Sequence, residues 1–446
     1  MGKGLQNNLM TDNKRLYFAS LGICAVLYFI WPTTHTIAFR KLLLLSAAAV
    51  AIYIWYRSAE PKVILGSSWF IYATLLLFWV IFHASFLSQN GGEAWGEFLG
   101  QWLPPYVALL AGIGCALASR MVSPRTFRIY LVVMLVSQSV FYLFFSIFKS
   151  VQLGEMARGF HNWGITDHKL SLTFYADLVA ALACAKIIDG IKSGAKLSSI
   201  AFWVLPIALA IYVAFFADSL NGFILLGGCI LLTIAITVRM CRKSIPAGAW
   251  AIAILLTGVM MYVAGTSSNL AAKREVLAST TRIALDIDKQ TNWSNFPIVP
   301  LPNDEHGAQV KESLYLRVAY ATAGLRTMVE NPLGYGVTRH AFERIIQQKY
   351  PDSNIANSHN AYIDLVSAVG FPALILLALV VISLLRQFRR SSSEWAHPAI
   401  WMIGLISVHW MLDPISRDHY FETTLFLIGL FGTLTLERKA EYGGQA

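Results

Sequence analysis

The sequence predicts an all-α polytopic membrane protein with about twelve transmembrane helices and one large, partly helical loop outside the bilayer. Hydrophobic residues make up 56% of the 446 residues and charged residues only 13%, which lies outside the usual range of soluble globular proteins. Apolar runs long enough to cross about 30 Å of hydrocarbon as helices recur along the chain. The stretch 266–360 is the one long polar interruption between them.

Each predicted span is an apolar run bounded by polar residues. The runs lie near 16–31, 40–56, 68–87, 102–119, 126–148, 170–188, 197–216, 220–238, 247–265, 361–385, 397–412 and 419–436. Several are short or closely adjacent, so eleven or thirteen spans would also fit the pattern. We therefore divide the chain into helices 1–9 (1–265), the large loop (266–360), and helices 10–12 with a tail (361–446).

Lys and Arg residues are concentrated in alternate connections, which the positive-inside rule assigns to the cytoplasm. These connections contain Arg57 and Lys62; Arg120, Arg125 and Arg128; Lys186, Lys192 and Lys196; Arg239, Arg242 and Lys243; Arg386, Arg389 and Arg390; and Arg438 and Lys439. Both termini should then be cytoplasmic and the large loop should lie on the outer face. The net charge of +10 is explained by basic residues in the cytoplasmic loops, next to membrane lipids. No nucleic acid partner is therefore expected.

The large loop should contain two helices. Apolar residues from Leu314 to Met328 recur at a helical period, and the pattern ends at Asn331-Pro332 before a glycine-containing turn. A second amphipathic segment covers 337–350 and stops at Pro351. The part from about 286 to 310 contains three prolines and is predicted to be irregular.

A histidine lies where the large loop meets the next apolar run, in the segment Asn357–Asp364. Asn357 or Ser358 can cap the helix that follows, which leaves backbone N–H groups and a positive dipole end beside His359. Such a place favours negative charge and suits a phosphate-bearing lipid. The alternative is that His359 is only an interfacial side chain in a capped turn.

Several other basic side chains stand on the outer rim: Arg158, Lys169, Arg317, Arg326, Arg339 and His340. Guanidinium groups stay charged and can hold a diphosphate at two points, although arginines on a membrane surface also serve for solvation or headgroup contact. The cysteine spacing indicates neither a disulfide framework nor a metal site. Adjacent residues such as Asp167 and His168 seldom face one metal ion, so we expect no metal and no cofactor.

The order of motifs in the second half resembles the superfamily of O-antigen ligases and O-antigen polymerases. The motifs are Arg317, the turn Asn331–Gly336, the segment Ser358–Tyr362 and the glycine segment Gly370–Ala373. In that superfamily a large periplasmic loop with an arginine, a similar glycine turn and a terminal histidine precede a membrane helix with a glycine. The motifs cover about a seventh of the chain, whereas the layout of spans around one late loop resembles the family over its whole length.

The resemblance implies a GT-C-like glycosyltransferase in the bacterial inner membrane. Its donor would be a glycan on undecaprenyl diphosphate and its acceptor the lipid A-core of lipopolysaccharide, with His359 and Arg317 as catalytic residues. Substrate-binding residues would come from Arg158, Lys169, Arg326, Tyr335, Arg339, His340 and Asn360. The family often has a Ser-Arg-Gly segment near a mid-chain span, where this chain has Ser219-Leu220-Asn221-Gly222. Arg158 or Lys169 could supply the charge that is missing there.

The chemistry follows from the residue types. A departing diphosphate needs positive charge more than a general acid, and an attacking hydroxyl needs a base with a near-neutral pKa, such as histidine. We therefore expect a single displacement with inversion, in which His359 takes the proton. Ala368 stands where many polymerases have an acidic residue, which favours a ligase. A polymerase, a protein O-oligosaccharyltransferase, and a transporter of anionic lipids remain the alternatives.

Overall fold

A computed structural model describes residues 3–33, 35–57, 61–157, 166, 169–240, 270–304, 307, 309–414 and 418–436. This part of the chain is helical, and its one β-type contact is an isolated bridge between Asn303 and Gln309. The elements are α1 (Lys3–Ile30), α2 (Ile37–Arg57), α3 (Pro61–Leu65), α4 (Ser68–Phe86), α5 (Gly91–Glu97), η1 (Phe98–Trp102), α6 (Leu103–Ser119), α7 (Pro124–Leu153), α8 (Lys169–Lys192), α9 (Leu197–Phe202), α10 (Val204–Phe216), α11 (Leu220–Met240), α13 (Leu270–Leu285), η2 (Thr291–Asn295), α14 (Glu312–Glu330), α15 (Ala341–Lys349), α16 (Ala361–Arg390), α17 (Ala396–His409) and α18 (Asp418–Leu434).

Eight of the described helical segments are long and apolar enough to cross a membrane, by length and composition. They are Ile37–Arg57, Ser68–Phe86, Gly91–Ser119, Pro124–Leu153, Lys169–Lys192, Leu197–Phe216, Asn221–Arg239 and Ala361–Arg390. Each corresponds to one predicted span. The predicted span 16–31 corresponds to Arg15–Ile30, the apolar part of α1, and the predicted spans 397–412 and 419–436 correspond to the shorter helices α17 and α18. The predicted span 247–265 lies outside the described residues. The described part of the chain is thus all-α with the apolar helices of a multi-pass membrane protein, and the total of twelve spans stays a prediction.

The membrane helices pack closely because small residues line their contacts. A Cβ added to Gly112 of α6 would lie 2.1 Å from the Phe426 carbonyl of α18, and one on Gly429 would lie 2.2 Å from the Leu109 carbonyl. Glycine is therefore required where these two backbones meet. Helix α8 is buried along nearly all of its length and packs against α7, α10, α11 and α17. It stands at the centre of its half of the bundle.

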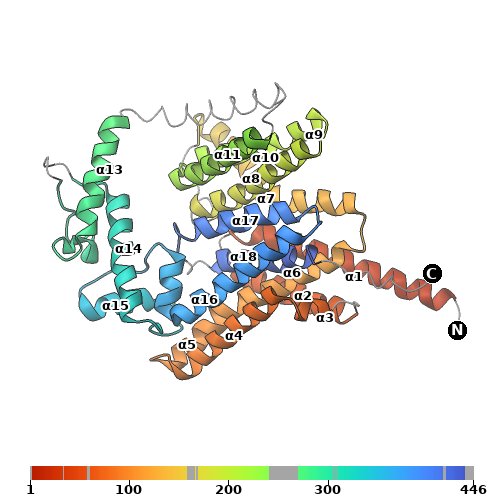
Figure 1. Ribbon diagram of the computed structural model, residues 1–446, viewed down its shortest axis with the longest axis horizontal. Helices are drawn as coiled ribbons and strands as arrows, with labels where there is room; N and C mark the ends of the chain where they lie inside the picture. Colours follow the sequence, from red (N-terminus) through yellow and green to blue (C-terminus); the bar gives the residue numbers. More distant parts are fainter. Residues whose placement is uncertain are drawn as a thin grey trace.

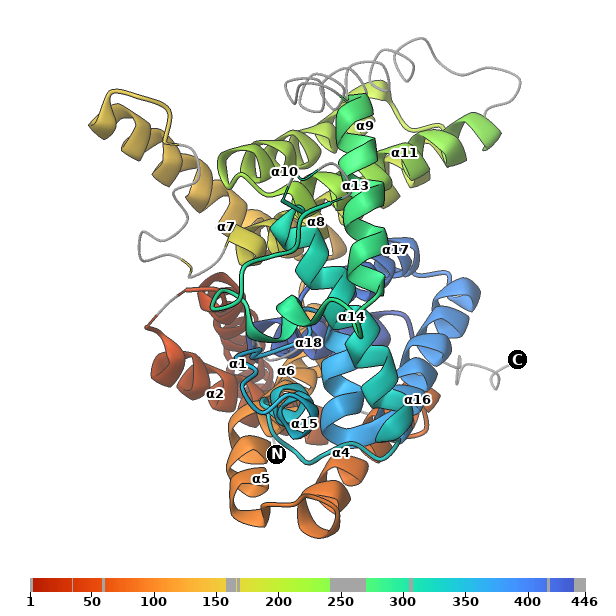
Figure 2. The same ribbon diagram turned by 90° about the vertical axis from the view of Figure 1, so that its left-hand side faces the viewer.

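The loop helices α13, α14 and α15 lie at one end of the molecule, and the first residues of α1 lie at the other (Figure 1). Seen from the loop end, α14 and α15 lie over the first turns of α16 (Figure 2). The loop has an apolar core of its own, which includes Trp293, Tyr315 and Phe342 and extends to Ile363 and Val366 of α16. This core couples the loop to the helix that follows it.

The two predicted loop helices are present, with shifted boundaries. Helix α14 covers the predicted apolar pattern and ends at Glu330, just before Asn331-Pro332. Helix α15 begins at Ala341 rather than 337, because the preceding residues form a turn in which the His340 N–H donates to the Thr338 hydroxyl (3.2 Å). The irregular segment predicted near 286–310 contains the short helix η2. There Trp293 is fully buried and donates to the Ile287 carbonyl (3.3 Å).

The glycine turn of the loop is docked on a kink in α16. Gly370 has φ +78°, which interrupts the helix. The turn replaces the hydrogen bonds that the kink removes: Tyr335 N–H donates to Ser367 O (2.8 Å), Gly336 N–H to Ala368 O (3.0 Å) and Phe371 N–H to Pro332 O (2.9 Å). These contacts hold the loop against a defined point of the membrane helix.

The kink and the turn approach so closely that both need glycine. A Cβ on Gly334 would lie 2.7 Å from Gly370 N, and one on Gly370 would lie 2.6 Å from the Leu333 carbonyl carbon. Helix α4 completes this junction, because His83 Nε2 lies 2.7 Å from Leu333 O and Trp79 Nε1 donates to Val369 O (2.7 Å). Three separate stretches of sequence thus support one backbone crossing.

Candidate functional site

The segment before α16 is a capped turn, as predicted, but the capping residue is different. Asn360 is the N-cap, and its side-chain oxygen accepts from Tyr362 N–H (3.0 Å) and Ile363 N–H (3.3 Å). Asn357 and Ser358, the predicted caps, lie too early because the helix begins at Ala361. Ser358 instead donates through its backbone N–H and its hydroxyl to Asp364 (3.0 and 2.6 Å). The side chain of Asn360, which was predicted to bind substrate, instead accepts hydrogen bonds from the backbone at the start of α16.

His359 is held in an unusual conformation at the end of this turn. Its φ of +55° lies in the left-handed region, and its backbone N–H donates to the Asn357 side-chain oxygen (3.1 Å). The imidazole stacks on Tyr320 of α14, with ring centroids 6.0 Å apart and planes inclined by 10°. Burial raises the pKa of Tyr320 to about 12, so its hydroxyl is neutral at physiological pH. The histidine is therefore oriented by the loop helix as well as by its own turn.

Arg317 stands three residues before Tyr320, which places the two side chains on neighbouring positions of one face of α14. The guanidinium is half-buried and donates through Nη1 to the side-chain oxygen of Asn221 (3.2 Å). Burial lowers the pKa of Arg317, and the carboxylate of Asp413 opposes that shift. An arginine still remains protonated in proteins, so a positive charge is held beside α11.

The turn that precedes α11 brings a second cation to this place. Lys169, the first residue of α8, donates through Nζ to the Asp218 carbonyl (3.0 Å). Asp218 itself has φ +52°. Asn221, three residues later, accepts from Arg317. Lys169 and Arg317 therefore contact the two ends of the turn Asp218–Asn221. That Lys169 supplies a substrate-binding charge here stays a prediction, and Arg158 lies outside the described residues.

Two buried residues near Arg317 were not predicted as site residues. His409, the last residue of α17, and Asp413 are both almost fully buried, with His409 Nε2 3.8 Å from the Asp413 carboxylate. The His409 ring packs on Phe174 and Tyr420, at centroid distances of 4.7 and 5.1 Å. The sequence contained one signal, because Asp413 is an acidic residue in a short connection on the predicted outer face.

The structure separates four other predicted site residues from this group. Arg326 stands nine positions after Arg317, hence half a turn around the helix, and pairs with Asp288 of the loop (2.7 Å). Arg339 pairs with Glu97 (3.5 Å). His340 contacts Glu343 (2.7 Å) within α15, and the Tyr335 ring lies under the Arg344 guanidinium. These side chains are engaged within the loop or between the loop and the region of α5.

His359 thus lies on Tyr320 of α14, and Arg317 of the same helix and Lys169 of α8 contact the turn before α11. An imidazole can take a proton from a hydroxyl, and the cations can stabilise an anionic leaving group. Within the described residues, no three His, Cys, Asp or Glu side chains are grouped to hold a metal ion. The donors that are present suit an anionic ligand.

Comparison with known proteins matches part of the chain to one family. Residues 205–378 match the family described as O-antigen ligase, a range that contains α11, the large loop and the first half of α16. No curated protein matches the chain. The family supports a function of the ligase or polymerase type, with lipid-linked glycan and lipid acceptor as the general substrates. The matched range includes His359, Arg317 and the Asp218–Gly222 turn, and it supports the assignment of this chain to the O-antigen ligase family.

Proposed function

We propose that this protein is an O-antigen ligase of the inner membrane, which transfers a glycan from undecaprenyl diphosphate to the lipid A-core of lipopolysaccharide at the periplasmic face. The observation that carries the proposal is the placement of His359: its ring stacks on Tyr320, one turn along α14 from Arg317. A base and a diphosphate-binding cation are thereby supported by the same helix. Ala368, in place of an acidic residue, favours the ligase over the polymerase.

The reaction we propose is a single displacement at the anomeric carbon, without a metal. A hydroxyl oxygen of the acceptor sugar attacks that carbon while His359 takes the hydroxyl proton. The bond from the anomeric carbon to the diphosphate oxygen breaks, and its electron pair leaves with undecaprenyl diphosphate. Arg317 and Lys169 stabilise the charge that develops on that oxygen, and the configuration at carbon is inverted.

Replacement of the histidine tests this role directly. In the purified full-length protein, supplied with lipid-linked donor and lipid A-core acceptor, His359→Ala should reduce transfer by about a hundredfold or more, as expected for loss of a general base. His397→Ala is the matched control, since this histidine contacts Asp189 (2.7 Å) near the other end of α17 and should leave transfer unchanged. Wild-type rates in a membrane-inserted His359→Ala protein would exclude the base role.

The choice between acceptors needs a different measurement. A strain that lacks the protein should lose all glycan-capped core if the protein is a ligase, and should keep a single repeat on the core if it is a polymerase. Normal lipopolysaccharide with unglycosylated proteins would indicate a protein O-oligosaccharyltransferase. If the protein were a transporter, the detergent-purified form would give no glycosidic product.

A further inference from the structure

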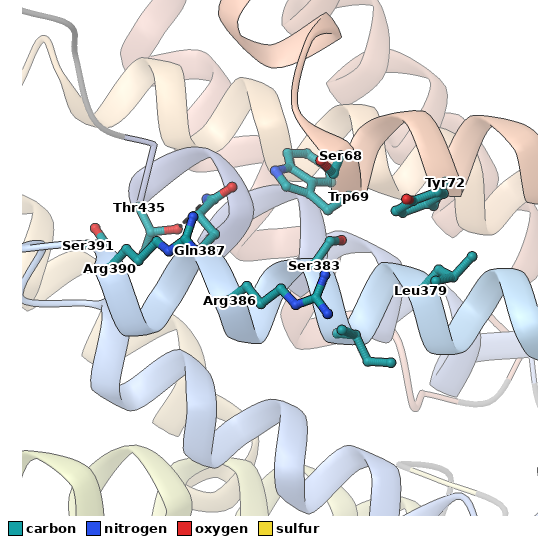
Figure 3. A pocket seen from close by; sticks show the side chains of 11 residues that line it. Ser68, Trp69, Tyr72, Leu379, Ser383, Arg386, Gln387, Arg390, Ser391 and Thr435 are labelled. Carbon is teal, nitrogen blue, oxygen red and sulfur yellow. Dashed lines mark hydrogen bonds between the residues drawn. The ribbon is translucent and has the colours of Figure 1, made fainter.

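A cavity lies at the far end of α16 from His359. It has a volume of about 500 Å³ and is lined by Ser68, Trp69, Tyr72, Leu379, Ile382, Ser383, Arg386, Gln387, Arg390, Ser391 and Thr435. Figure 3 shows residues of α4 and residues of α16 facing it from two sides. Gln387 stands twenty-six residues after the start of α16, roughly 40 Å along the helix. The cavity is therefore separate from the candidate transfer site.

The charged residues of this cavity have one sign. Arg386 and Arg390 are four positions apart, so they share a face of α16, and both are exposed. Neither forms an ion pair within the described part of the chain, and no acidic residue is among those that line the cavity. Two guanidinium groups at this spacing match an anion with several oxygens, such as a phosphate.

A buried donor also borders the cavity. The Trp69 side chain is 1% exposed, and its indole N–H has no acceptor among the described residues. A buried N–H without a partner is costly. The nearby amide nitrogen of Gln387 is itself a donor, to Gly432 O (2.6 Å) and the Thr435 hydroxyl (2.8 Å). Gly432 allows the indole to lie here, since a Cβ would be 2.8 Å from Trp69 Cε2.

One part of the cavity wall is apolar and lies toward the middle of α16. Leu379 and Ile382 precede Arg386 by one to two turns of α16, and Ile382 is 42% exposed. Along the helix axis the cavity therefore changes from apolar to cationic toward the helix end. A free phosphate ion makes no favourable contact with the apolar part of the cavity, whereas a phospholipid has both a charged headgroup and an apolar chain.

We propose that this cavity binds an anionic glycerophospholipid of the leaflet opposite to the candidate transfer site. Arg386 and Arg390 bind its phosphate, Trp69 Nε1 donates to a phosphate or ester oxygen, and an acyl chain lies along Leu379 and Ile382. The bound lipid joins α4 to α16 at the end of these helices that has no contact with the loop.

Binding by the purified full-length protein tests the proposal. Native mass spectrometry with added dioleoylphosphatidylglycerol should show a bound lipid, which dioleoylphosphatidylcholine replaces only at much higher concentration. The double variant Arg386→Gln/Arg390→Gln should bind this anionic lipid at least tenfold more weakly, and Trp69→Phe a fewfold more weakly, because a charge-assisted hydrogen bond contributes more than a neutral one. Arg389→Gln removes the same charge from an exposed neighbour that does not line the cavity, and should bind as wild type does.

Three results would overturn the proposal. Equal losses in Arg389→Gln and in the double variant would show general surface charge rather than a site. Release of the lipid by millimolar inorganic phosphate, with phosphate alone bound as tightly, would show a site for the free ion. Finally, a photoreactive phosphatidylglycerol should crosslink the wild-type protein within 68–72, within 379–391 or at Thr435. Crosslinks confined to other segments would exclude the cavity even if the variants failed to fold.

Discussion

At the scale of single residues, the candidate site is where the backbone departs from ordinary conformations. Three non-glycine residues of the described chain have positive φ, and two of them, Asp218 and His359, belong to the site. A left-handed residue with a Cβ costs about 1–2 kcal/mol, so surrounding contacts must stabilise it. Asn357 does this for His359, and Lys169 contacts the carbonyl of Asp218. These conformations point the two turns toward α14.

The stack of His359 on Tyr320 leads to a test of positioning. Tyr320→Leu should slow transfer about two- to tenfold, because an aromatic pair contributes about 0.5–1.5 kcal/mol beyond burial. Tyr320→Phe keeps the ring and should retain most of the rate. A pH profile of kcat should keep its shape in both variants, since neither change removes the base. Equal losses in the two variants would assign the effect to the hydroxyl instead of the stack.

Arg317 should show that stability and activity are in conflict at this site. Burial lowers the pKa of Arg317, which means that folding costs free energy when the guanidinium is charged. Since the group is charged at every pH below that pKa, the cost applies throughout the physiological pH range. Arg317→Leu should therefore abolish transfer while the melting temperature stays equal or rises. A clear fall in melting temperature would show that the hydrogen bond to Asn221 and the attraction to Asp413 outweigh the cost of burial.

At the scale of elements, α16 lacks helical hydrogen bonds around Gly370, and backbone groups of the loop turn form hydrogen bonds with α16 there instead. Each recovered backbone bond contributes about 0.5–1.5 kcal/mol, and the three bonds to residues 332–336 act together. Pro372 adds to the interruption, because it has no N–H to donate. The turn therefore contributes to the stability of α16 at its kink, although 34 positions separate Gly336 from Gly370 in the sequence.

Substitution of the two glycines should separate conformational strain from collision. Gly334→Ala and Gly370→Ala combine a positive φ with a contact of 2.6–2.7 Å, so each should destabilise the protein by about 2 kcal/mol or more. Gly307→Ala has a similar φ of +79° and no atom within 4 Å, so only the conformational cost of about 1 kcal/mol remains. Thermal unfolding of the detergent-purified variants measures the difference. Equal shifts in all three would mean that the junction relaxes without cost.

At the scale of the whole molecule, the loop with His359 stands at one end of the helices and the arginine-rich end of α16 at the other (Figure 1). This separation agrees with the orientation predicted from the positive-inside rule. A single cysteine at Ile298, which is 74% exposed, should react with a membrane-impermeant maleimide from the periplasm once the natural cysteines are replaced. A cysteine at Arg389 should react only after the inner membrane is opened. The reverse pattern would invert the proposed topology.

Sequence reasoning predicted those features that depend on local pattern. Hydrophobic runs located eight membrane-spanning helices, and periodicity located α14 and its end at Asn331-Pro332. Features that depend on long-range packing were missed. Trp293 lies in a proline-containing stretch and is buried only because α14 and α15 cover it, and Asp413 lies near Arg317 only because α17 ends beside the start of α16. No periodicity reports such contacts, since the residues involved are about twenty to a hundred positions apart.

The crossing of the glycine turn with α16 also bears on how the chain is made. During synthesis the turn at 332–336 leaves the ribosome before Gly370, so the partners of its N–H and C=O groups do not yet exist. The turn can therefore dock only after α16 has been made and its kink has formed. The segment around His359 would then reach its final arrangement late in the synthesis of this part of the chain.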